Sequence, residues 1–486
     1  MDAHLLSLIT FIPLIGMALI LLLRGDTLIK VVAAIFAGIP LALSLRLLRL
    51  YNPGTSEFQF IERGPWIPSF SIEYFMGVDG LGVTMVLLTT LLSFICIFAS
   101  WGINRGVKGY FSLFLLLQTG MTGVFCALDF ILFYVLWEVM LLPMYFLIGV
   151  WGGPRREYAA IKFFLYTLFG SVFMLLAILA LYFISEPHTF SMLQLFGADR
   201  GYGYLFRTMV WLGFFVAFAI KVPIFPFHTW LPDAHVEAPT AISVILAGVL
   251  LKMGVYGILR VNFAILPQAT ADAAYWMAIL GLINIVYGAL CAMAQKDLKK
   301  LVAYSSVSHM GFCLLGMASF TPQGVNGAVM QMFNHGIITG MLFLLVGVIY
   351  DRAHHREIEG FGGLMVRMPI YAGITSLAFF ASLGLPGLAG FWGEALVFLG
   401  AFNVYRTITI ISTAGIVLGA AYFLWTLQRM FLGPLNEKYK DLPEVNGREL
   451  FTLVPLGART VIFGIWPSWL IDLFRVTMAG ITSYLP

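Results

Sequence analysis

The sequence predicts an all-α polytopic membrane protein with about fourteen transmembrane helices, arranged around two inverted five-helix repeats that each contain one broken helix. Its 486 residues are 60 % hydrophobic and only 11 % charged, with a mean hydropathy of +0.92. A soluble domain has about 45–50 % apolar and about 25 % charged residues. The composition therefore excludes a water-soluble enzyme, a nucleic-acid-binding protein and a disordered chain.

Continuous apolar runs separated by short polar breaks define the expected helices. A helix needs about 20 apolar residues to cross the hydrocarbon core of a bilayer, and fourteen runs approach this length. The expected spans are residues 5–22, 29–49, 79–101, 111–128, 130–150, 161–184, 206–228, 239–260, 273–293, 299–318, 324–350, 370–400, 406–430 and 450–474.

Lysine and arginine are concentrated in the loops that follow odd-numbered spans, whereas the other loops contain few of them. Examples are Arg105 and Lys108 after the third span, and Lys296, Lys299 and Lys300 after the ninth. Basic loops stay on the cytoplasmic side of a membrane. We therefore expect a multi-pass protein of the bacterial inner (plasma) membrane, with both termini on the non-cytoplasmic side.

Two spans are interrupted by helix breakers, at residues 221–226 (KVPIFP) and 384–387 (GLPG). Pro223 and Pro386 are 163 residues apart, and the fourth and ninth spans begin 162 residues apart. This shared offset predicts two repeats of five helices, and the odd number inverts the second copy, as in many ion-translocating proteins. The expected domains are helices one to three (1–110), the first repeat (111–260), the inverted repeat (273–430) and a C-terminal loop and helix (431–486).

Five titratable side chains lie well inside expected spans: Glu138, Lys221, Lys252, His309 and Glu394. A charge at the bilayer centre costs at least about 2.5–3.5 kcal/mol, so each of these groups needs a partner, water or a function. A pair such as Glu138 and Lys221 that forms and separates would switch the lysine between holding and releasing its proton. The expected chemistry is a gated proton relay.

The prolines near Lys221 and Glu394 give a reason for polar surroundings at these depths. A proline inside a helix removes a backbone donor. We therefore expect the carbonyls of Ala219, Val222 and Ser382 to lack their usual helical partners and to meet water or polar groups of the protein.

Each candidate also has a structural interpretation. Glu138 and Lys221 can form a static buried pair, Glu394 can anchor two helices, and His309 can hydrogen-bond within the core. Lys252 has no acidic neighbour in sequence, which makes a structural role harder to explain.

Three further histidines are accessory candidates. His335 fits the relay and a structural role equally well. His228 and His235, in the connection between the seventh and eighth spans, fit a tightly packed loop or a proton-uptake mouth. Lys162 lies near a helix end, where its side chain can snorkel to the interface. Asp79 begins the third span and fits a helix-terminal or subunit-contact residue.

No sequence pattern indicates a cofactor or a metal. The four cysteines, Cys96, Cys126, Cys291 and Cys313, lie in apolar runs without a CxxC motif, which argues against iron–sulfur and zinc sites. No glycine-rich loop suited to phosphate is present, and the glycines fall mainly in apolar helices, where close packing explains them.

Three long motifs stand at residues 227–235 (FHTWLPDAH), 237–254 (EAPTAISVILAGVLLKMG) and 303–309 (AYSSVSH). They resemble the antiporter-like membrane subunits of respiratory complex I, the proton-translocating NADH:quinone oxidoreductase, and the resemblance extends over nearly the whole chain. Within that family the chain is similar to the subunit M, or mitochondrial subunit 4, type. It has the fourteen-span length without a long lateral helix, and Glu394 stands where sister subunits usually have lysine.

The resemblance implies roles for the candidate residues. In the family, the glutamate matching Glu138 pairs with the lysine matching Lys221 to gate the channel. The residues matching Lys252 and His309 pass the proton along a central axis, and the one matching Glu394 takes it toward the exit.

The resemblance also implies partners: other membrane subunits of complex I, including sister antiporter-like subunits on either side, with lipid around them and no nucleic acid. NADH and quinone are bound by other subunits. The same relay fits the large subunit of a multisubunit sodium/proton antiporter or of an energy-conserving hydrogenase, and a passive scaffold is a further alternative. The identity of the partners distinguishes these classes.

Overall fold

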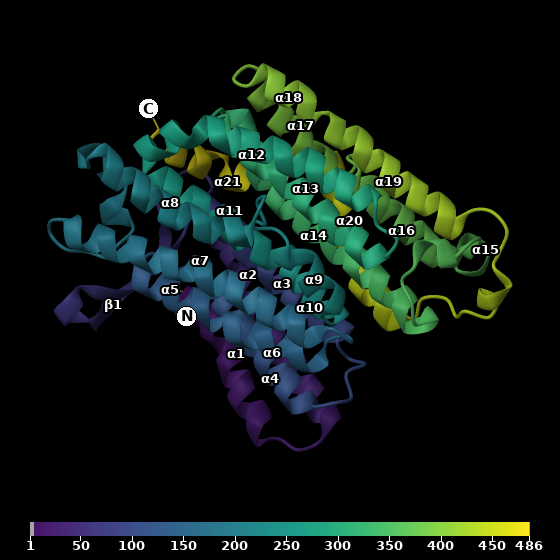
Figure 1. Ribbon diagram of the computed structural model, residues 1–486. Helices are drawn as coiled ribbons and strands as arrows, with labels where there is room; N and C mark the ends of the chain where they lie inside the picture. Colours follow the sequence, from purple (N-terminus) through teal and green to yellow (C-terminus); the bar gives the residue numbers. More distant parts are fainter. Residues whose placement is uncertain (1–3, 486) are drawn as a thin grey trace.

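The computed structural model describes residues 4–485, which fold mainly into long helices (Figure 1). All fourteen runs expected to be spans are largely helical. The helices of the N-terminal half are α1 (Leu5–Leu22), α2 (Asp26–Leu50), α3 (Gly80–Ala99), α4 (Val107–Val124), α5 (Phe130–Val139), α6 (Leu141–Trp151), α7 (Arg156–Ile184), α8 (Tyr204–Lys221) and α9 (Trp230–Glu237).

A single long helical segment follows α9 and contains two π-helical turns. It consists of α10 (Thr240–Ile245), a π-helical turn (Leu246–Leu250), α11 (Leu251–Gly257) and a second π-helical turn (Ile258–Phe263). The remaining helices are α12 (Pro267–Met293), α13 (Leu298–Ala318), α14 (Pro322–Ala353), α15 (Leu364–Arg367), α16 (Pro369–Ser382), α17 (Ala389–Phe402), α18 (Arg406–Ser412), α19 (Ala414–Phe431), α20 (Gly447–Ile465) and α21 (Pro467–Thr482). Short 3-10 turns occupy Pro68–Phe70, Leu193–Leu195, Ala198–Gly201, Ile358–Gly360 and Glu437–Tyr439.

Within the described residues, eleven helices are long and apolar enough to cross a membrane, or twelve if the bent pair α20–α21 is one span. The axes of α20 and α21 differ by 76°. Both α16 and α17 are only 14 residues long, because the expected twelfth span is broken between them. The chain is therefore a multi-span membrane protein, and its full number of spans stays a prediction.

A two-stranded antiparallel hairpin interrupts the helices between α2 and α3 and corrects the all-α expectation. Its strands are β1 (Gln59–Ile67) and β2 (Ile72–Val78), in a region expected to be a polar connection. The buried carboxylate of Glu62 on β1 accepts the backbone N–H of Leu6 at 2.7 Å and of Ser7 at 3.2 Å. The hairpin thus supplies acceptors for unpaired donors at the start of α1.

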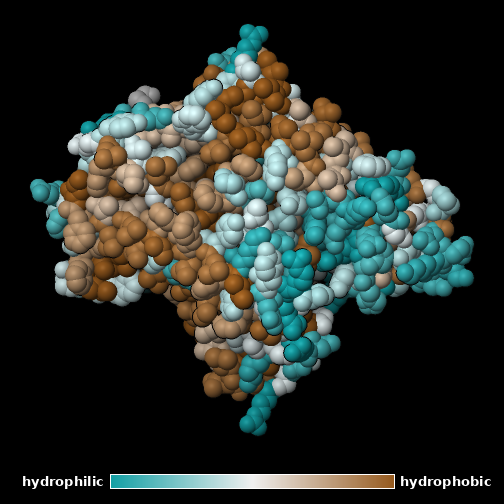
Figure 2. Space-filling model, viewed as in Figure 1, coloured by the Kyte–Doolittle hydropathy of each residue, from teal (hydrophilic) through white to brown (hydrophobic). Residues whose placement is uncertain are grey.

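The centre of the bundle consists of α3, the α10–α11 segment, α13 and α14. The best apolar windows of the α10–α11 segment and of α14 are completely buried, whereas α7 and the α18–α19 span bury only 39 % of theirs. On α7 the outward residues Ile161, Leu165, Phe169 and Leu176 recur at helical spacing. Figure 2 shows apolar side chains over the left part of the molecule, where α7 and α8 lie, and hydrophilic ones toward the right, near α15.

Two glycines let the central helices approach closely. A Cβ atom at Gly336 of α14 would lie 2.9 Å from the carbonyl oxygen of Gly248 in the first π-helical turn. Only glycine fits this contact without displacing one of the two helices.

A buried ion pair connects the start of α3 to the second π-helical turn. Asp79 caps α3 by accepting the N–H of Gly82 at 3.0 Å, and its Oδ1 lies 2.7 Å from Nη2 of Arg260. Both side chains are 1 % exposed, and the guanidinium lies 4.7 Å from the ring centroid of Phe58. The helix-terminal interpretation of Asp79 agrees with this geometry, while its partner Arg260 was not expected.

We predict that Asp79→Asn destabilises the fold, because asparagine can still cap α3 but leaves the buried charge of Arg260 without its counterion. Removing one partner of a buried pair costs about 3–5 kcal/mol. The free energy of unfolding of the purified chain in detergent measures this loss. The control is Asp472→Asn, whose pair with Arg475 is exposed, and exposed pairs contribute about 0–1 kcal/mol. Equal losses in the two variants would contradict the prediction.

Candidate functional site

The first break in the helices lies beside Lys221, the last residue of α8, and the chain becomes helical again at Trp230 of α9. As expected, the carbonyl of Ala219 lacks its usual helical partner and meets another polar group of the protein, because the N–H of Ile224 donates to it at 2.8 Å. The loop folds back by one residue more than a helix would, which replaces the donor that Pro223 lacks.

Asn284 of α12 stabilises the same break from the side. Its Oδ1 accepts the N–H of Phe225 at 2.8 Å, and its Nδ2 donates to the carbonyl of Pro223 at 3.1 Å. Trp230 Nε1 adds a hydrogen bond to the carbonyl of Ile220 at 2.9 Å. Asn284 was not among the residues expected at the site, although a lone amide in the apolar run 273–293 was a usable signal.

Lys221 and Glu138 lie close together but are not in direct contact. The Lys221 ammonium is buried and lies 5.3 Å from the ring centroid of Trp137, the residue before Glu138, and 5.4 Å from that of Phe163. Within residues 4–485, no ion pair of 4.0 Å or less joins the two groups, and Oε1 of Glu138 is buried without a hydrogen-bond partner. The two groups are therefore separated, and the Lys221 ammonium is packed against two aromatic rings.

Lys252, on the central segment, contacts His335 of α14. The ammonium Nζ lies 2.6 Å from Nδ1 of His335 and donates to the carbonyl of Ala247 at 2.5 Å. Ala247 belongs to the first π-helical turn, in which the i→i+4 hydrogen-bond pattern is lost. Both Lys252 and His335 are buried. The structure thus brings His335, an accessory candidate, into direct contact with a principal one.

His309 of α13 extends this arrangement to the second break. Its ring centroid lies 5.6 Å from that of His335, and its Nδ1 lies 3.3 Å from Oε1 of Glu394 on α17. Its Nε2 lies 3.3 Å from the hydroxyl of Ser382, where α16 ends. Lys252, His335, His309 and Glu394 therefore lie in a row, which we call the buried row.

The buried row borders a small internal cavity of about 10 Å³, close to the volume that one water molecule needs. Polar groups that line the cavity come from three elements, α13, α14 and the broken α16–α17 pair. The lining includes His309, Gln331, His335, Ser382 and Glu394.

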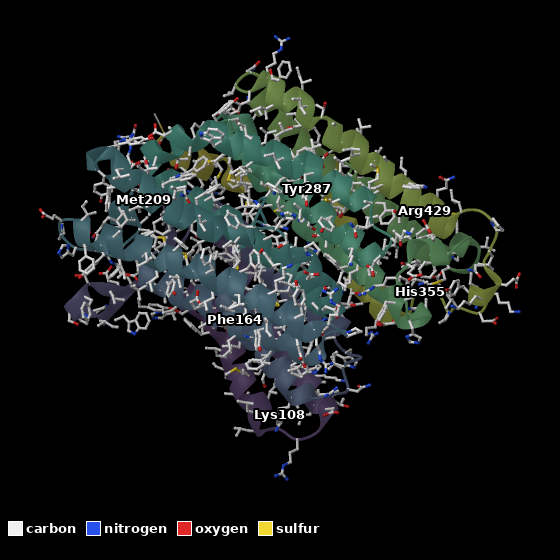
Figure 3. The ribbon with its side chains drawn as sticks, in the orientation of Figure 1. Lys108, Phe164, Met209, Tyr287, His355 and Arg429 are labelled. Atoms are coloured by element: carbon white, nitrogen blue, oxygen red, sulfur yellow. The ribbon has the colours of Figure 1, made fainter. Side chains whose placement is uncertain are left out.

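His228 precedes α9 and His235 lies within it, and both remain compatible with their two interpretations. The buried ring of His228 lies 5.1 Å from that of Tyr287, which is labelled on α12 in Figure 3. His235 is fully buried against Phe343 at 4.5 Å, and neither of its ring nitrogens has a partner in the described part of the chain.

His235 belongs to α9, which lies outside the candidate spans. Burial and the positive charges of Lys299 and Lys252 lower the pKa of its imidazole well below the ordinary value. The ring is therefore neutral at pH 7, and one of its nitrogens can accept a proton.

Lys162, for which snorkelling was expected, forms an ion pair with α9. Its ammonium lies 2.7 Å from Oδ2 of Asp233 on α9. A hydrogen bond of 2.9 Å between Tyr166 and Thr229 lies beside it. These two contacts attach the short helix α9 to α7, and this fixes the position of the loop after Lys221.

Chemically, the site can hold and pass protons. Lysine, histidine and glutamate all exchange protons near neutral pH once burial and neighbouring charges act on them. Within residues 4–485, no group of three or more histidine, cysteine, aspartate or glutamate side chains is placed to hold a metal ion.

A buried row of titratable groups that ends beside a broken helix, in a polytopic helical bundle, is typical of ion-translocating membrane proteins. Residues 127–419 match the family model described as NADH:quinone oxidoreductase/Mrp antiporter, transmembrane. This match covers more than half of the chain, and the chain belongs to that family.

Known proteins agree with this assignment over the full length. The chain is 44 % identical to NADH-quinone oxidoreductase subunit M of Rhodobacter capsulatus, covering 99 % of this chain and 96 % of that protein. A chain in the structure of respiratory complex I from Thermus thermophilus with bound NADH has a TM-score of 0.91 and 30 % identity, with 100 % of both chains covered. A chain of the Mrp complex from Dietzia sp. has the same fold, with a TM-score of 0.88, 20 % identity and coverage of 99 % and 97 %.

We predict that Asn284→Ala destabilises the protein at the break after α8. The substitution leaves the N–H of Phe225 and the carbonyl of Pro223 without their side-chain partner, and an unsatisfied buried group costs about 1–3 kcal/mol. The free energy of unfolding in detergent should fall by this amount. Asn403→Ala, at an exposed helix end, is the control and should leave stability unchanged. A loss no larger than the control's would show that Asn284 does not support the break.

Proposed function

We propose that this chain is a proton-translocating membrane subunit of NADH:quinone oxidoreductase (complex I), driven by electron transfer in other subunits. The observation that carries the proposal is the contact between Lys252 and His335, which extends through His309 to Glu394. The near-complete match to subunit M of Rhodobacter capsulatus supports the parent complex. The chain takes part in the enzyme as a subunit, while NADH and quinone bind elsewhere.

In the proposed relay, Glu138 and Lys221 act as the gate. When the carboxylate approaches, its charge favours the protonated lysine, and when it withdraws, desolvation by Trp137 and Phe163 favours proton release. The separated arrangement of the two groups supports a pair that opens and closes. A static buried pair would place the two groups in contact.

The buried row carries the proton onward. The Lys252 ammonium donates directly to His335 Nδ1, and His309 is placed between His335 and the carboxylate of Glu394. Moving one charge across 100 mV requires about 2.3 kcal/mol. A two-unit change in the pKa of one group supplies a similar amount, at about 1.36 kcal/mol per unit. Coupled changes in pKa along the row are therefore large enough to move one proton against a membrane potential of this size.

We also propose fourteen spans in two inverted five-helix repeats (111–260 and 273–430), flanked by 1–110 and 431–486. The breaks after Lys221 and after Ser382, at corresponding positions of the two units, support this arrangement. The proposed location is the bacterial inner membrane, with both termini on the non-cytoplasmic side. The concentration of lysine and arginine in alternate loops supports that orientation.

The proposed partners are the other membrane subunits of complex I, with sister antiporter-like subunits on both sides. The outward apolar face of α7 is wide enough to contact lipid or a neighbouring subunit, and Glu138 is only half-buried in the isolated chain. The alternative parent complexes are a sodium/proton antiporter and an energy-conserving hydrogenase. Mass spectrometry of the intact purified assembly tests the choice, because flavin and iron–sulfur subunits are expected only with complex I or hydrogenase, and NADH-binding subunits only with complex I.

We predict that Lys221→Ala and Glu138→Ala abolish proton translocation while the complex still assembles. His335→Ala should reduce translocation at least tenfold, and Lys252→Ala should also impair it, since each change interrupts the relay. Quenching of a pH-sensitive dye in inverted membrane vesicles measures translocation, and native gels measure assembly. Lys108→Ala is the control, because this lysine lies in the first turn of α4, at the lower end of the molecule (Figure 3). Normal translocation by assembled Lys221→Ala complex would count against the relay.

The proposed orientation predicts opposite labelling of two loops. A cysteine replacing Lys440 should react with a membrane-impermeant thiol reagent only from the cytoplasmic side, and a cysteine replacing Thr55 only from the other side. Both positions lie in loops, and the native Cys96, Cys126 and Cys313 are buried. The unmodified chain, treated in right-side-out and inverted vesicles, controls for the partly exposed Cys291. The reverse labelling pattern would show that the assigned sides are wrong.

A further inference from the structure

The helix α20 is attached to α14 near both of its ends. At the first end, the guanidinium of Arg352 on α14 lies 2.9 and 2.7 Å from the two carboxylate oxygens of Glu449, and these side chains are only 8 % and 10 % exposed. At the other end, the ring centroids of Phe333 on α14 and Phe463 lie 5.5 Å apart. The position of α20 relative to α14 is therefore fixed along its length.

The C-terminal end of α20 lies directly against the second break, residues 383–388 between α16 and α17. A Cβ atom at Gly464 would overlap the carbonyl oxygen of Gly387 and lie 2.5 Å from its carbonyl carbon. This is a contact between two backbones, so no flexible side chain can absorb a displacement of either segment. The position of the second break therefore follows that of α20.

An indole N–H joins α17 to the same end of α20. Nε1 of Trp392 donates to the carbonyl oxygen of Gly464 at 2.7 Å. Gly464 lies in the last turn of α20, and the last four carbonyl groups of a helix have no partner within that helix. Trp392 therefore satisfies one of these acceptors and fixes the first turn of α17 to α20.

Glu394 lies two residues after Trp392, and its carboxylate rests against the second break itself. A Cβ atom at Gly384 would lie 2.5 Å from Oε2 of Glu394. The other oxygen, Oε1, lies 3.3 Å from Nδ1 of His309. The distance between the carboxylate and the imidazole therefore depends on where the break and the first turn of α17 are held.

The two breaks differ in the helices that hold them. Asn284 of α12 holds the first break, as described above. At the second break, Nδ2 of Asn334 on α14 donates to the carbonyl of Ala389 at 2.6 Å, and α20 adds the contacts of Gly464. Both α12 and α14 belong to the proposed repeats, whereas α20 lies outside them. A helix outside the repeats thus acts on the group at the end of the buried row.

We propose that α20 positions the second break, and that Trp392 is the positioning residue through which α20 sets the contact between Glu394 and His309. This inference rests on the proposed relay and gives a role to a helix outside both repeats. Without the indole hydrogen bond, the first turn of α17 moves away from α20 and carries Glu394 with it. The gap of 3.3 Å to His309 then lengthens, and a hydrogen bond longer than about 3.5 Å contributes little.

The substitution Trp392→Phe removes the indole N–H and keeps an aromatic ring. In the assembled complex we expect proton translocation to fall at least threefold, because the carboxylate of Glu394 moves away from His309. The control is Trp276→Phe, the same change at a tryptophan on α12 that is 66 % exposed, and it should leave translocation unchanged. Dye quenching in inverted vesicles measures translocation, and native gels measure assembly.

The infrared band of the Glu394 carboxyl group distinguishes positioning from a general loss of stability. This band is identified as the one that the substitution Glu394→Gln removes. Its frequency depends on the hydrogen bonds of the carboxyl group, so we expect a shift in Trp392→Phe and none in Trp276→Phe. An unchanged band in assembled Trp392→Phe complex would overturn the proposal.

The substitution Gly464→Ala tests the same contact from the side of α20. Its methyl group overlaps the carbonyl of Gly387 and separates α20 from the break, so the Glu394 band should shift and translocation should fall. Gly457→Ala, on the same helix, is the control, because its methyl group meets Leu377 and Met341 at ordinary distances of 3.4 and 3.7 Å. Identical bands in the two glycine variants would contradict the proposal.

Translocation by Glu394→Gln separates failure of the positioning role from failure of the relay. If this variant loses translocation while the Trp392 and Gly464 variants keep both the band and the rate of the unmodified complex, the relay stands and the positioning role is rejected. If Glu394→Gln translocates normally and the band shifts in Trp392→Phe, the relay through Glu394 is rejected, while α20 still positions the carboxylate.

Discussion

The ammonium group of Lys252 donates to a backbone carbonyl and to the ring of His335 in a completely buried part of the bundle. A charge in this environment needs such partners, since an unpaired ion in an apolar interior costs several kcal/mol. The π-helical turn supplies the carbonyl of Ala247, and α14 supplies the imidazole. The rest of the buried row follows from the same requirement, because His309 and Glu394 provide partners for each other where α16 ends.

The first broken helix is firmly held in place. Asn284, Trp230 and the N–H of Ile224 satisfy the backbone around Pro223, while two contacts attach α9 to α7. A backbone whose hydrogen bonds are all satisfied moves little. The freedom to gate a proton is therefore expected in side chains, above all in Lys221, whose ammonium contacts aromatic faces in place of a fixed anion.

Local features of the sequence predicted much of this architecture. The apolar runs predicted the positions of the helices, and the prolines predicted both breaks. A proline lacks an N–H, and this removes a hydrogen bond from the helical turn in which the proline lies. All five principal candidates lie in helices, and three of them belong to the buried row. Partners chosen by tertiary packing could not be predicted from sequence. The bond from Glu62 of the hairpin to α1, the Asp79–Arg260 pair, Lys162 with Asp233, and Asn284 at the break all join segments far apart in the chain.

The contact between Gly248 and Gly336 determines how far apart Lys252 and His335 stand. Gly248 lies four positions before Lys252, and Gly336 lies one position after His335. A single methyl group at position 336 would press against a carbonyl 2.9 Å away and widen the space between the two segments. The hydrogen bond of 2.6 Å between lysine and imidazole would lengthen with it, and hydrogen bonds longer than about 3.5 Å contribute little. In the proposed relay, the length of the shortest link is thus set by two residues that carry no side chain at all.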